Sequence, residues 1–442
     1  MLHVTWIASV VVAVTMAMAM ASATAMAMEN ELGQGVQCSG KANTAAPYTA
    51  PPQLVASTTN GKKFVVGPTG NQITVVHLYG TPYEMGVAAG TLLKQEIINL
   101  YDEFLPWVEE QALAYAKHLP RSLVDIITDI GIEAGLEMEV LLTEKYTPKH
   151  FVEEMKGIAD GAGLTYNKVH RYSMFPELIK AACTIIAGWG NATKDGSLTQ
   201  VRALDWGVDN PMRYAPITFV YHPEAGQGNA FMTQGFPGFV GAITGYSTET
   251  AICEKVWIHS NETILQGRPG YPWHFLLRDI LQFDSTIAEA TARMQAAKRT
   301  ASIFVGVGSR VDGQGRIFEY SYDQLNEFDW NTPFPGYAPT PAEHPAMTDL
   351  VYVDKHSQPS SHPCTASLLD AIHGDITPEA IEQDFVSWVE TGDMMIAVYD
   401  FGTNSVDVSV ASQDPEANPI LKAYERQFIR YDMAALFAEP RP

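Results

Sequence analysis

The chain has 442 residues and a formal net charge of −22, and 46% of its residues are hydrophobic. That apolar fraction supports a large core, and the length alone allows two or three domains. A strongly acidic surface repels the phosphates of nucleic acids and anionic membranes, which argues against nucleic acid as a partner.

The first 28 residues have the composition of a targeting segment. The run Trp6–Met20 is apolar, and small residues follow it up to Ala27. This pattern predicts a cleaved signal peptide over residues 1–28 and a secreted or lysosomal protein. An uncleaved signal anchor is the alternative, because Trp6–Met28 is long enough to span a bilayer.

Upstream of Cys183 the sequence indicates mostly helices. Residues 29–60 are rich in Thr, Ala, Pro and Gly and indicate an irregular lead-in. Apolar periodicity and turn residues then predict a hairpin and three helices. The hairpin strands are 63–66 and 73–78, and the helices are one that opens at 80–86, one at 123–132 and one at 151–162. Pro106 ends or kinks the first helix, and Gly161 and Gly163 end the third.

Downstream of Cys183, short strand-like runs are separated by turns that contain glycine. The predicted strands are 216–221, 230–234, 239–244, 251–257, 302–307, 316–322, 350–354, 394–400 and 405–411. The predicted helices are 273–282, 285–298, 366–373, 378–389 and 425–438. Runs of strands beside runs of helices, rather than strict alternation, indicate an α+β fold with a largely antiparallel sheet.

The stretch around Cys183 combines groups that suit nucleophilic catalysis. Two short strands, one starting near Cys183 and one at 201–206, are predicted around a turn at 191–197. Hairpin pairing would bring Arg202 and Asp205 near the thiol, which needs a base or a cation to become a thiolate. A free α-amine on Cys183 would supply that base, since its reference pKa is about 8. Arg202 and Asp205 point to opposite faces of an ideal strand, so both reach one site only if the strand bends or ends near Leu204.

These residues resemble a known superfamily. Cys-Thr at a strand start followed by Arg-x-x-Asp-Trp is similar to the N-terminal-nucleophile hydrolases, which include bile-salt hydrolases, penicillin V acylases, acid ceramidase and isopenicillin-N acyltransferases. The segments Gly80–Gly86, Glu154–Gly163 and Gly270–Phe275 look like the acyltransferase-like branch, and the similarity covers roughly residues 60–410. The resemblance implies a four-layer αββα sandwich of two antiparallel sheets, and cleavage or transfer of an acyl group from an amide.

Carried onto this chain, the resemblance makes Cys183 the nucleophile and assigns Arg202 and Asp205 to the motif positions. It implies self-cleavage between Ala182 and Cys183. Residues 29–182 would then be a helical pro-region, and residues 183–442 a catalytic chain that stays associated with it in one globular unit.

The oxyanion donor departs from that pattern. Relatives place an asparagine later in the chain, whereas the corresponding strand Ala251–Trp257 contains none. Glu254, Lys255 and Asn261 are the remaining side-chain candidates. A backbone N–H is a further candidate for the donor. The adjacent charges Glu254 and Lys255 favour a solvated ion pair on the surface over a place in the site.

The remaining cysteines and the sequons complete the expectations. If Cys183 is a nucleophile, at most two of the other three cysteines can pair, such as Cys253 with Cys364 or Cys38 with Cys364, and the sequence does not choose. No C-x-x-C motif is present, which argues against a structural zinc or a redox dithiol, and no cofactor or metal is expected. Asn191 and Asn261 begin sequons and are predicted to be glycosylated.

The sequence therefore predicts a secreted or lysosomal, self-cleaving amidohydrolase. Its substrate would be a small N-acyl amide or lipid with an apolar acyl group, a choice that depends on the resemblance alone. Two alternatives remain open at this stage: a phospholipase-B-like lipid ester hydrolase, and a non-catalytic secreted binding protein on the same scaffold.

Overall fold

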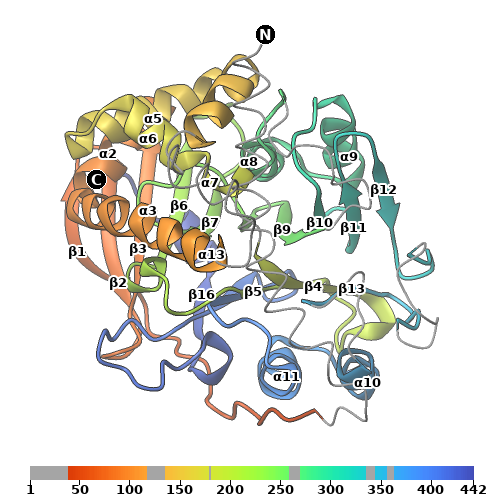
Figure 1. Cartoon of the computed structure of the whole chain (residues 1–442). Coiled ribbons are helices and arrows are strands. Elements are labelled where there is room, and N and C mark those ends of the chain that lie inside the picture. Colours follow the sequence, from red (N-terminus) through yellow and green to blue (C-terminus); the bar gives the residue numbers. More distant parts are fainter. Residues whose placement is uncertain (1–37, 117–134, 179–180, 258–268, 335–343, 356–362) are drawn as a thin grey trace.

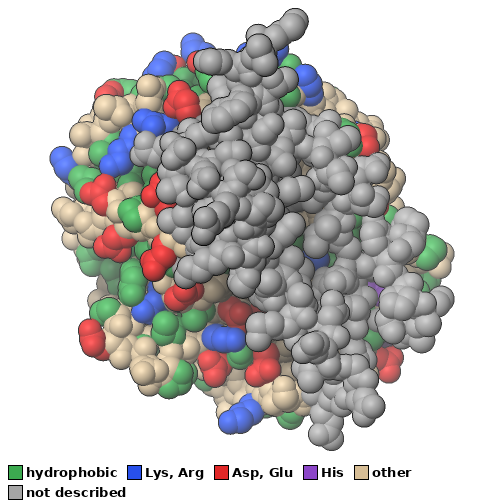
Figure 2. Space-filling model, in the orientation of Figure 1, with side chains coloured by type: hydrophobic (Ala, Val, Ile, Leu, Met, Phe, Trp, Pro, Cys, Tyr) green, Lys and Arg blue, Asp and Glu red, His purple; other side chains and the backbone are tan. Residues whose placement is uncertain are grey.

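The computed structural model describes residues 38–116, 135–178, 181–257, 269–334, 344–355 and 363–442. The predicted signal peptide, the predicted helix at 123–132 and the sequon at Asn261 lie outside these residues. Within the described ranges, no helix is both long enough and apolar enough to cross a membrane. On the face shown in Figure 2, acidic and basic side chains are interspersed over the described surface.

The described residues form two β-sheets. The larger sheet has ten strands in the order β1-β2-β3-β6-β7-β8-β9-β10-β11-β12. All neighbouring strands in it are antiparallel except β3 and β6, which are parallel. Its strands are β1 (Gln53–Thr58), β2 (Gly61–Val66), β3 (Ile73–Gly80), β6 (Ile217–Pro223), β7 (Phe231–Gly235), β8 (Thr244–Ser247), β9 (Thr250–Val256), β10 (Ile303–Ser309), β11 (Gln314–Tyr320) and β12 (Leu325–Phe328).

The smaller sheet has six antiparallel strands in the order β13-β4-β5-β14-β15-β16. Its strands are β13 (Leu350–Val353), β4 (Ala182–Gly188), β5 (Thr199–Asp205), β14 (Met395–Asp400), β15 (Ser405–Val410) and β16 (Ile429–Asp432). Two predicted hairpins, β2–β3 and β14–β15, are confirmed.

Helices cover the outer face of each sheet, as Figure 1 shows. Those on the larger sheet are α2 (Pro82–Leu92), α3 (Lys94–Ala116), residues 135–143, η1 (Glu144–Tyr146), α5 (Lys149–Ala162), α6 (Tyr166–Ser173), α7 (Phe175–Leu178), α8 (Trp273–Phe283) and α9 (Ile287–Ala296). Those on the smaller sheet are α10 (Pro363–Ala371), α11 (Pro378–Ala380), the π-helical turn η4 (Ile381–Val386), α12 (Ser387–Val389) and η5 (Ala423–Glu425). The short α13 (Met433–Phe437) follows β16. The predicted four-layer αββα architecture is therefore confirmed.

Strand alternation separates the core into layers. On β4, Cys183 and Ile185 face the core between the two sheets, which also contains Val220 and Phe304 of the larger sheet. Ile186 faces the other way, into the core beneath the helices of the smaller sheet. The cysteine of the motif therefore lies inside the sandwich rather than on its outer surface.

Glycines explain two of the sequence segments that resembled the acyltransferase-like branch, Gly80–Gly86 and Glu154–Gly163. A Cβ on Gly86 of α2 would lie 2.2 Å from the carbonyl oxygen of Glu154, and one on Gly157 of α5 would lie 2.2 Å from that of Tyr83. Helices α2 and α5 therefore pack with their backbones in contact, which only glycine permits. Gly161, predicted to help end the third helix, lies inside α5, which ends at Ala162.

Several expectations about secondary structure are wrong. The lead-in contains a strand, β1, and the first predicted helix is divided at Leu93 into α2 and α3. Pro106 does not end the helix but lies inside α3, because the apolar face continues past it to Val108, and the alternative that it kinks the helix stays a prediction. Most of 239–244 is a loop, in which Gly241 has a positive φ of 134°. The predicted helix 425–438 begins as β16, because its alternating buried residues pair with β15.

One disulfide joins distant parts of the chain. Cys38, in the segment before β1, is bonded to Cys364 of α10, with a Cα–Cα distance of 5.6 Å. Cys183 and Cys253 are both free and buried. Of the pairings that the sequence left open, the structure selects Cys38 with Cys364.

A buried carboxyl group makes the fold sensitive to alkaline pH. Glu382 in η4 is 1% exposed, and burial together with the nearby carboxylate of Asp407 raises its pKa far above the ordinary value of 4.5. Asp407 is itself held by Arg430, whose Nε donates to Oδ1 at 2.8 Å. Glu382 thus keeps its proton in the folded protein at neutral pH.

We expect thermal stability to fall as the pH rises from 5 to 9. The stability due to this proton is complete below the unfolded pKa and is lost as the pH rises through the folded pKa. Glu382→Gln should flatten the dependence of the melting temperature on pH, whereas Glu416→Gln on the exposed surface should not. Equal slopes for the parent and Glu382→Gln would show that another group is responsible.

Candidate active site

The predicted hairpin around Cys183 is present. In the antiparallel ladder of β4 and β5, Ala182 pairs with Asp205, Cys183 with Leu204, and Ile185 with Arg202. The connection contains the short turn η2 (Gly190–Ala192). Cys183 is therefore the second residue of a central strand, and its side chain is completely buried.

The guanidinium of Arg202 contacts the thiol of Cys183. Arg202 Nη2 donates to Cys183 Sγ at 3.3 Å, and Sγ is 3.6 Å from the carbonyl oxygen of Ala181. Burial raises the pKa of the Cys183 thiol well above its ordinary value, and the charge of Arg202 partly opposes that effect. In the uncut chain, Cys183 is thus a buried thiol whose anionic form Arg202 would stabilise.

Glu254 holds the same guanidinium from the larger sheet. Arg202 Nη2 lies 3.4 Å from Glu254 Oε2, and Arg202 Nε donates to the Glu254 carbonyl oxygen at 3.4 Å. Arg202 is 1% exposed and Glu254 7% exposed. Arg202 Nη1 is buried and has no hydrogen-bond partner among the described residues.

Lys255 is buried between the sheets. Ala251, Cys253 and Trp257 of the same strand register belong to the core between the sheets, and Lys255 shares their side of β9. It is 1% exposed, and its Nζ lies 5.3 Å from the ring centroid of Phe304. Burial lowers its pKa from the ordinary value. The interpretation of Glu254 and Lys255 as a solvated surface pair is therefore wrong.

Asp205 lies on the opposite face of β5 from Arg202, as strand alternation predicted. Its Oδ1 accepts from the Gly392 N–H at 2.8 Å, and its Oδ2 accepts from the Thr391 hydroxyl at 2.7 Å. Lys355 Nζ is 3.8 Å from Oδ1. Burial raises the pKa of Asp205 to about 6, and Lys355 opposes that shift. Asp205 does not contact the thiol, but it faces Ala182 across the ladder, at the predicted cleavage point.

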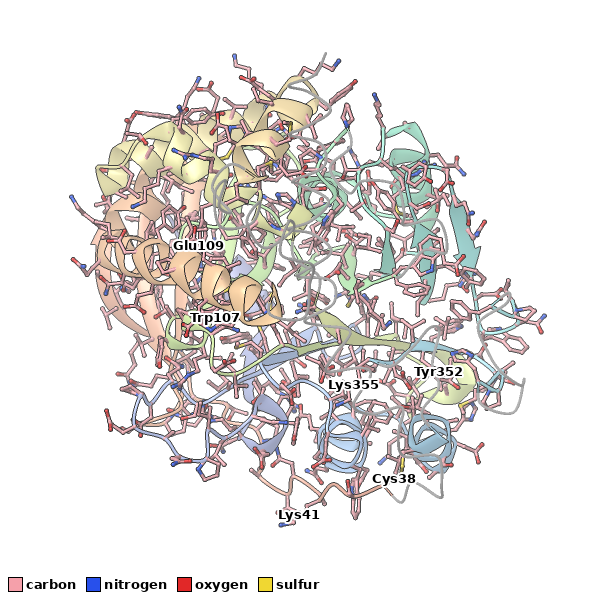
Figure 3. All side chains as sticks on the ribbon, in the orientation of Figure 1. Cys38, Lys41, Trp107, Glu109, Tyr352 and Lys355 are labelled. Atoms are coloured by element: carbon pink, nitrogen blue, oxygen red, sulfur yellow. A yellow bond between two sulfur atoms is a disulfide. The ribbon has the colours of Figure 1, made fainter. Side chains whose placement is uncertain are left out.

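An aromatic wall borders this end of the hairpin. Trp206, which follows Asp205, packs against both the core between the sheets and the core under the helices of the larger sheet. Its ring centroid lies 6.0 Å from that of Trp107 and 6.2 Å from that of Phe104, both on α3. Figure 3 shows Trp107 on the α3 side of the smaller sheet and Lys355 on its other side, toward α11.

Comparisons with known proteins show the family to which the chain belongs. No family model matches the chain. It is 44% identical to the protein dcd1A of Dictyostelium discoideum over 418 residues, which are 91% of this chain and 94% of that one. It is 42% identical to dcd1B of the same organism over 407 residues, 89% of this chain and 81% of that one. The chain belongs to the dcd1A and dcd1B family.

More distant proteins resemble this member of the dcd1A and dcd1B family. The acid ceramidase of Rattus norvegicus is 24% identical over 231 residues, 47% of this chain and 58% of that protein. A solved Caenorhabditis elegans N-acylethanolamine-hydrolyzing acid amidase ortholog has a TM-score of 0.39 and 14% identity, covering 56% of this chain and 98% of that one. Penicillin V acylase from Agrobacterium tumefaciens has a TM-score of 0.32 and 13% identity, covering 52% and 83%. The likeness to acid ceramidase supports the N-terminal-nucleophile superfamily and does not single out the isopenicillin-N acyltransferase branch.

Sequence reasoning about this family member missed three contributors to the site. Thr391, Gly392 and Lys355 hold Asp205 from segments at least 150 residues further along the chain. Asn191 is exposed, and its Nδ2 donates to Asp349 Oδ2 at 2.8 Å, so its glycosylation stays a prediction. Within the described ranges, no group of three or more His, Cys, Asp or Glu side chains has an arrangement that could hold a metal ion.

Proposed function

We propose that this chain is a self-cleaving amidohydrolase whose nucleophile is Cys183 once it has become an N-terminal residue. The contact of Arg202 Nη2 with Cys183 Sγ at 3.3 Å is the observation that carries the proposal. It joins the two halves of the motif that resembled N-terminal-nucleophile hydrolases. The likeness to acid ceramidase supports an amide as the bond that is cleaved.

Self-cleavage accounts for the burial of the nucleophile. Cys183 is 0% exposed in the uncut chain, so a substrate cannot reach its thiol. The thiol would first attack the carbonyl carbon of Ala182, and the peptide C–N bond would break to give a thioester and a free α-amine. Water would then release the Ala182 carboxylate and regenerate the thiol. Movement of the new chain end away from Cys183 would open the site.

In the cut protein the new amine is the general base. It would take the thiol proton, and the thiolate, stabilised by Arg202, would attack the substrate amide. The acyl group would pass to Cys183 as a thioester, and the amine product would leave with the proton. Water, or another amine in a transfer reaction, would then take the acyl group and regenerate the thiol. Asp205 faces the strand end where the new amine forms, and its carboxylate would orient the ammonium form.

The acyl group is proposed to be apolar. The aromatic wall of Trp206, Trp107 and Phe104 lies at the end of the hairpin that carries Cys183. Aromatic side chains bind hydrocarbon through buried area, and a small N-acyl amide or lipid presents that area. The apolar segment at residues 1–28 favours a secreted or lysosomal location, which is likewise a proposal.

The disulfide makes self-cleavage visible on a gel. Cys38 lies before the proposed cut and Cys364 after it, so chains 29–182 and 183–442 would remain joined. We expect purified protein to give one band without reductant and two bands with it. N-terminal sequencing of the larger band should begin Cys-Thr-Ile-Ile.

Cys364→Ser is the matched variant for this experiment. It should give two bands even without reductant, because the bridge between the chains is gone. Active protein that remains a single chain under reduction would contradict the N-terminal-nucleophile proposal. Protein that stays uncut at every pH between 4 and 8 and hydrolyses no amide would favour the binding-protein alternative.

A further inference from the structure

Lys255 is a buried cation that forms no ion pair with a carboxylate in the described part of the chain, although the charge of Asp354 raises its pKa and partly opposes the effect of burial. Its Nζ donates to the Val256 carbonyl oxygen at 3.3 Å and lies over the Phe304 ring. An ammonium in a protein interior is unfavourable unless an anion or several acceptors compensate it. A side chain placed in this way is suited to an anion that is present only during part of a reaction.

The path of β9 brings Lys255 to the nucleophile. Cys253 Sγ accepts from Gln200 Nε2 of β5 at 3.0 Å, and the next residue, Glu254, contacts Arg202. These contacts advance along β5 toward Leu204, which pairs with Cys183. Lys255 is the next residue of β9, so it lies nearer to the level of Leu204 and Cys183, and its side chain points to the side of β9 that faces the smaller sheet. Accordingly, its charge acts to lower the pKa of Cys183.

Arg202, which contacts the Cys183 thiol, also has a donor without an acceptor. Its Nη2 donates to Cys183 Sγ, whereas its Nη1 is buried without an acceptor. A buried donor that is left unpaired is unfavourable, so such a donor is informative where a reaction develops negative charge. Arg202 thus contacts the thiol, and Lys255 acts on it electrostatically from β9, so two cationic side chains with N–H donors serve one region.

We propose that Lys255 Nζ and Arg202 Nη1 form the oxyanion hole of this protein, an inference that rests on the proposed function. When the S–C bond forms at the substrate carbonyl, the C=O electron pair moves to oxygen, and these two groups donate to it. Collapse re-forms the C=O bond and expels the amine, which takes the proton held by the Cys183 α-amine. Lys255 takes the place of the asparagine that the resemblance led us to expect.

Lys255→Met tests this assignment. We expect kcat for a fluorogenic N-acyl aminocoumarin, per cleaved molecule, to fall about 100- to 1,000-fold, as when a single oxyanion donor is lost. KM should stay within about threefold, because the donor acts on the transition state rather than on the bound substrate. Lys255→Arg should regain part of the rate. The melting temperature should not fall, since an unpaired buried charge is removed.

Alkylation of Cys183 by iodoacetamide separates this role from an effect on the thiol. That reaction forms no oxyanion, so its rate in Lys255→Met should fall far less than kcat does, by only the amount that follows from losing the charge of Lys255 near the thiol. Exposed Lys156→Met, with the same change of charge, should match the parent in both assays. Equal losses in alkylation and hydrolysis would show that Lys255 tunes the thiol and would overturn the oxyanion assignment.

Self-cleavage and amide hydrolysis by the parent protein distinguish a failure of the oxyanion assignment from a failure of the proposed function. A parent that cuts itself and hydrolyses the amide, with a fully active Lys255→Met variant, overturns the assignment of Lys255 alone. A parent that neither cuts itself nor hydrolyses the amide overturns the proposed function, and this inference with it.

Discussion

Cys183→Ala will remain one uncut chain and will hydrolyse no amide. The methyl group cannot attack the Ala182 carbonyl, so neither the cut nor the α-amine base forms. The alanine fills most of the buried thiol site, and the fold should survive with a loss of about 1 kcal/mol. Reducing gels and intact mass measure cleavage, an N-acyl amide assay measures activity, and urea unfolding measures the loss of stability.

Two further variants make this test specific to position 183. Cys183→Ser should cut more slowly than the parent, because a hydroxyl attacks in the same way but is a poorer nucleophile. Cys253→Ser changes the other free buried cysteine and should cut and react as the parent does. Cleavage of Cys183→Ala between residues 182 and 183 without added protease would overturn the N-terminal-nucleophile proposal.

The sequence was sufficient for the local part of the site. The alternation of apolar residues and the turn at 191–197 predicted the β4–β5 hairpin, and pairing within it brings Arg202 to Cys183. The same alternation predicted that Asp205 would point to the opposite face. Interactions within one hairpin follow from strand geometry and can be read from a short segment.

The remote part of the site could not be read in that way. Glu254 and Lys255 are adjacent charges, a pattern that usually marks a solvated surface. They are buried because β9 is a central strand of one sheet and faces the other, and that depends on strand order. Lys355 and Thr391 reach Asp205 only because β13 and β14 flank the β4–β5 hairpin in the smaller sheet.

The disulfide and the end of the chain show the same limit. Cys38 and Cys364 are 326 residues apart, and only the folded chain brings their Cα atoms within bridging distance. Residues 429–432 alternate apolar and polar side chains over only four positions, and they form a strand because they pair with the edge of β15. Tertiary pairing then overrides a weak local preference for helix.

Replacing Arg202 should separate its chemical role from its structural one. Arg202→Met removes the donors to Cys183 Sγ and to the proposed oxyanion, and activity should fall at least about 1,000-fold. It also leaves Glu254 without its guanidinium contact in the interior, which should lower the free energy of unfolding by about 3 kcal/mol or more. Urea unfolding and hydrolysis per cleaved molecule measure the two effects independently.

A double variant distinguishes the two contributions to that loss. Arg202→Met combined with Glu254→Leu removes both charges of the buried pair, so stability should return toward that of the parent. Activity should not return, because no donor replaces the guanidinium beside Cys183. Recovery of activity together with stability would mean that Arg202 serves only to keep the fold intact.

Arg202→Lys tests the geometry of the guanidinium with the charge kept. Arg202 Nη2 reaches Cys183 Sγ and Glu254 Oε2 while Nη1 stays free, and a planar fork can hold these positions at once. A lysine ammonium has one nitrogen and cannot serve both neighbours and a reacting carbonyl from the same place. We therefore expect Arg202→Lys to keep most of the stability and to recover only part of kcat. A lysine variant as active as the parent would show that a single positive charge suffices there, which would remove Arg202 Nη1 from the oxyanion hole.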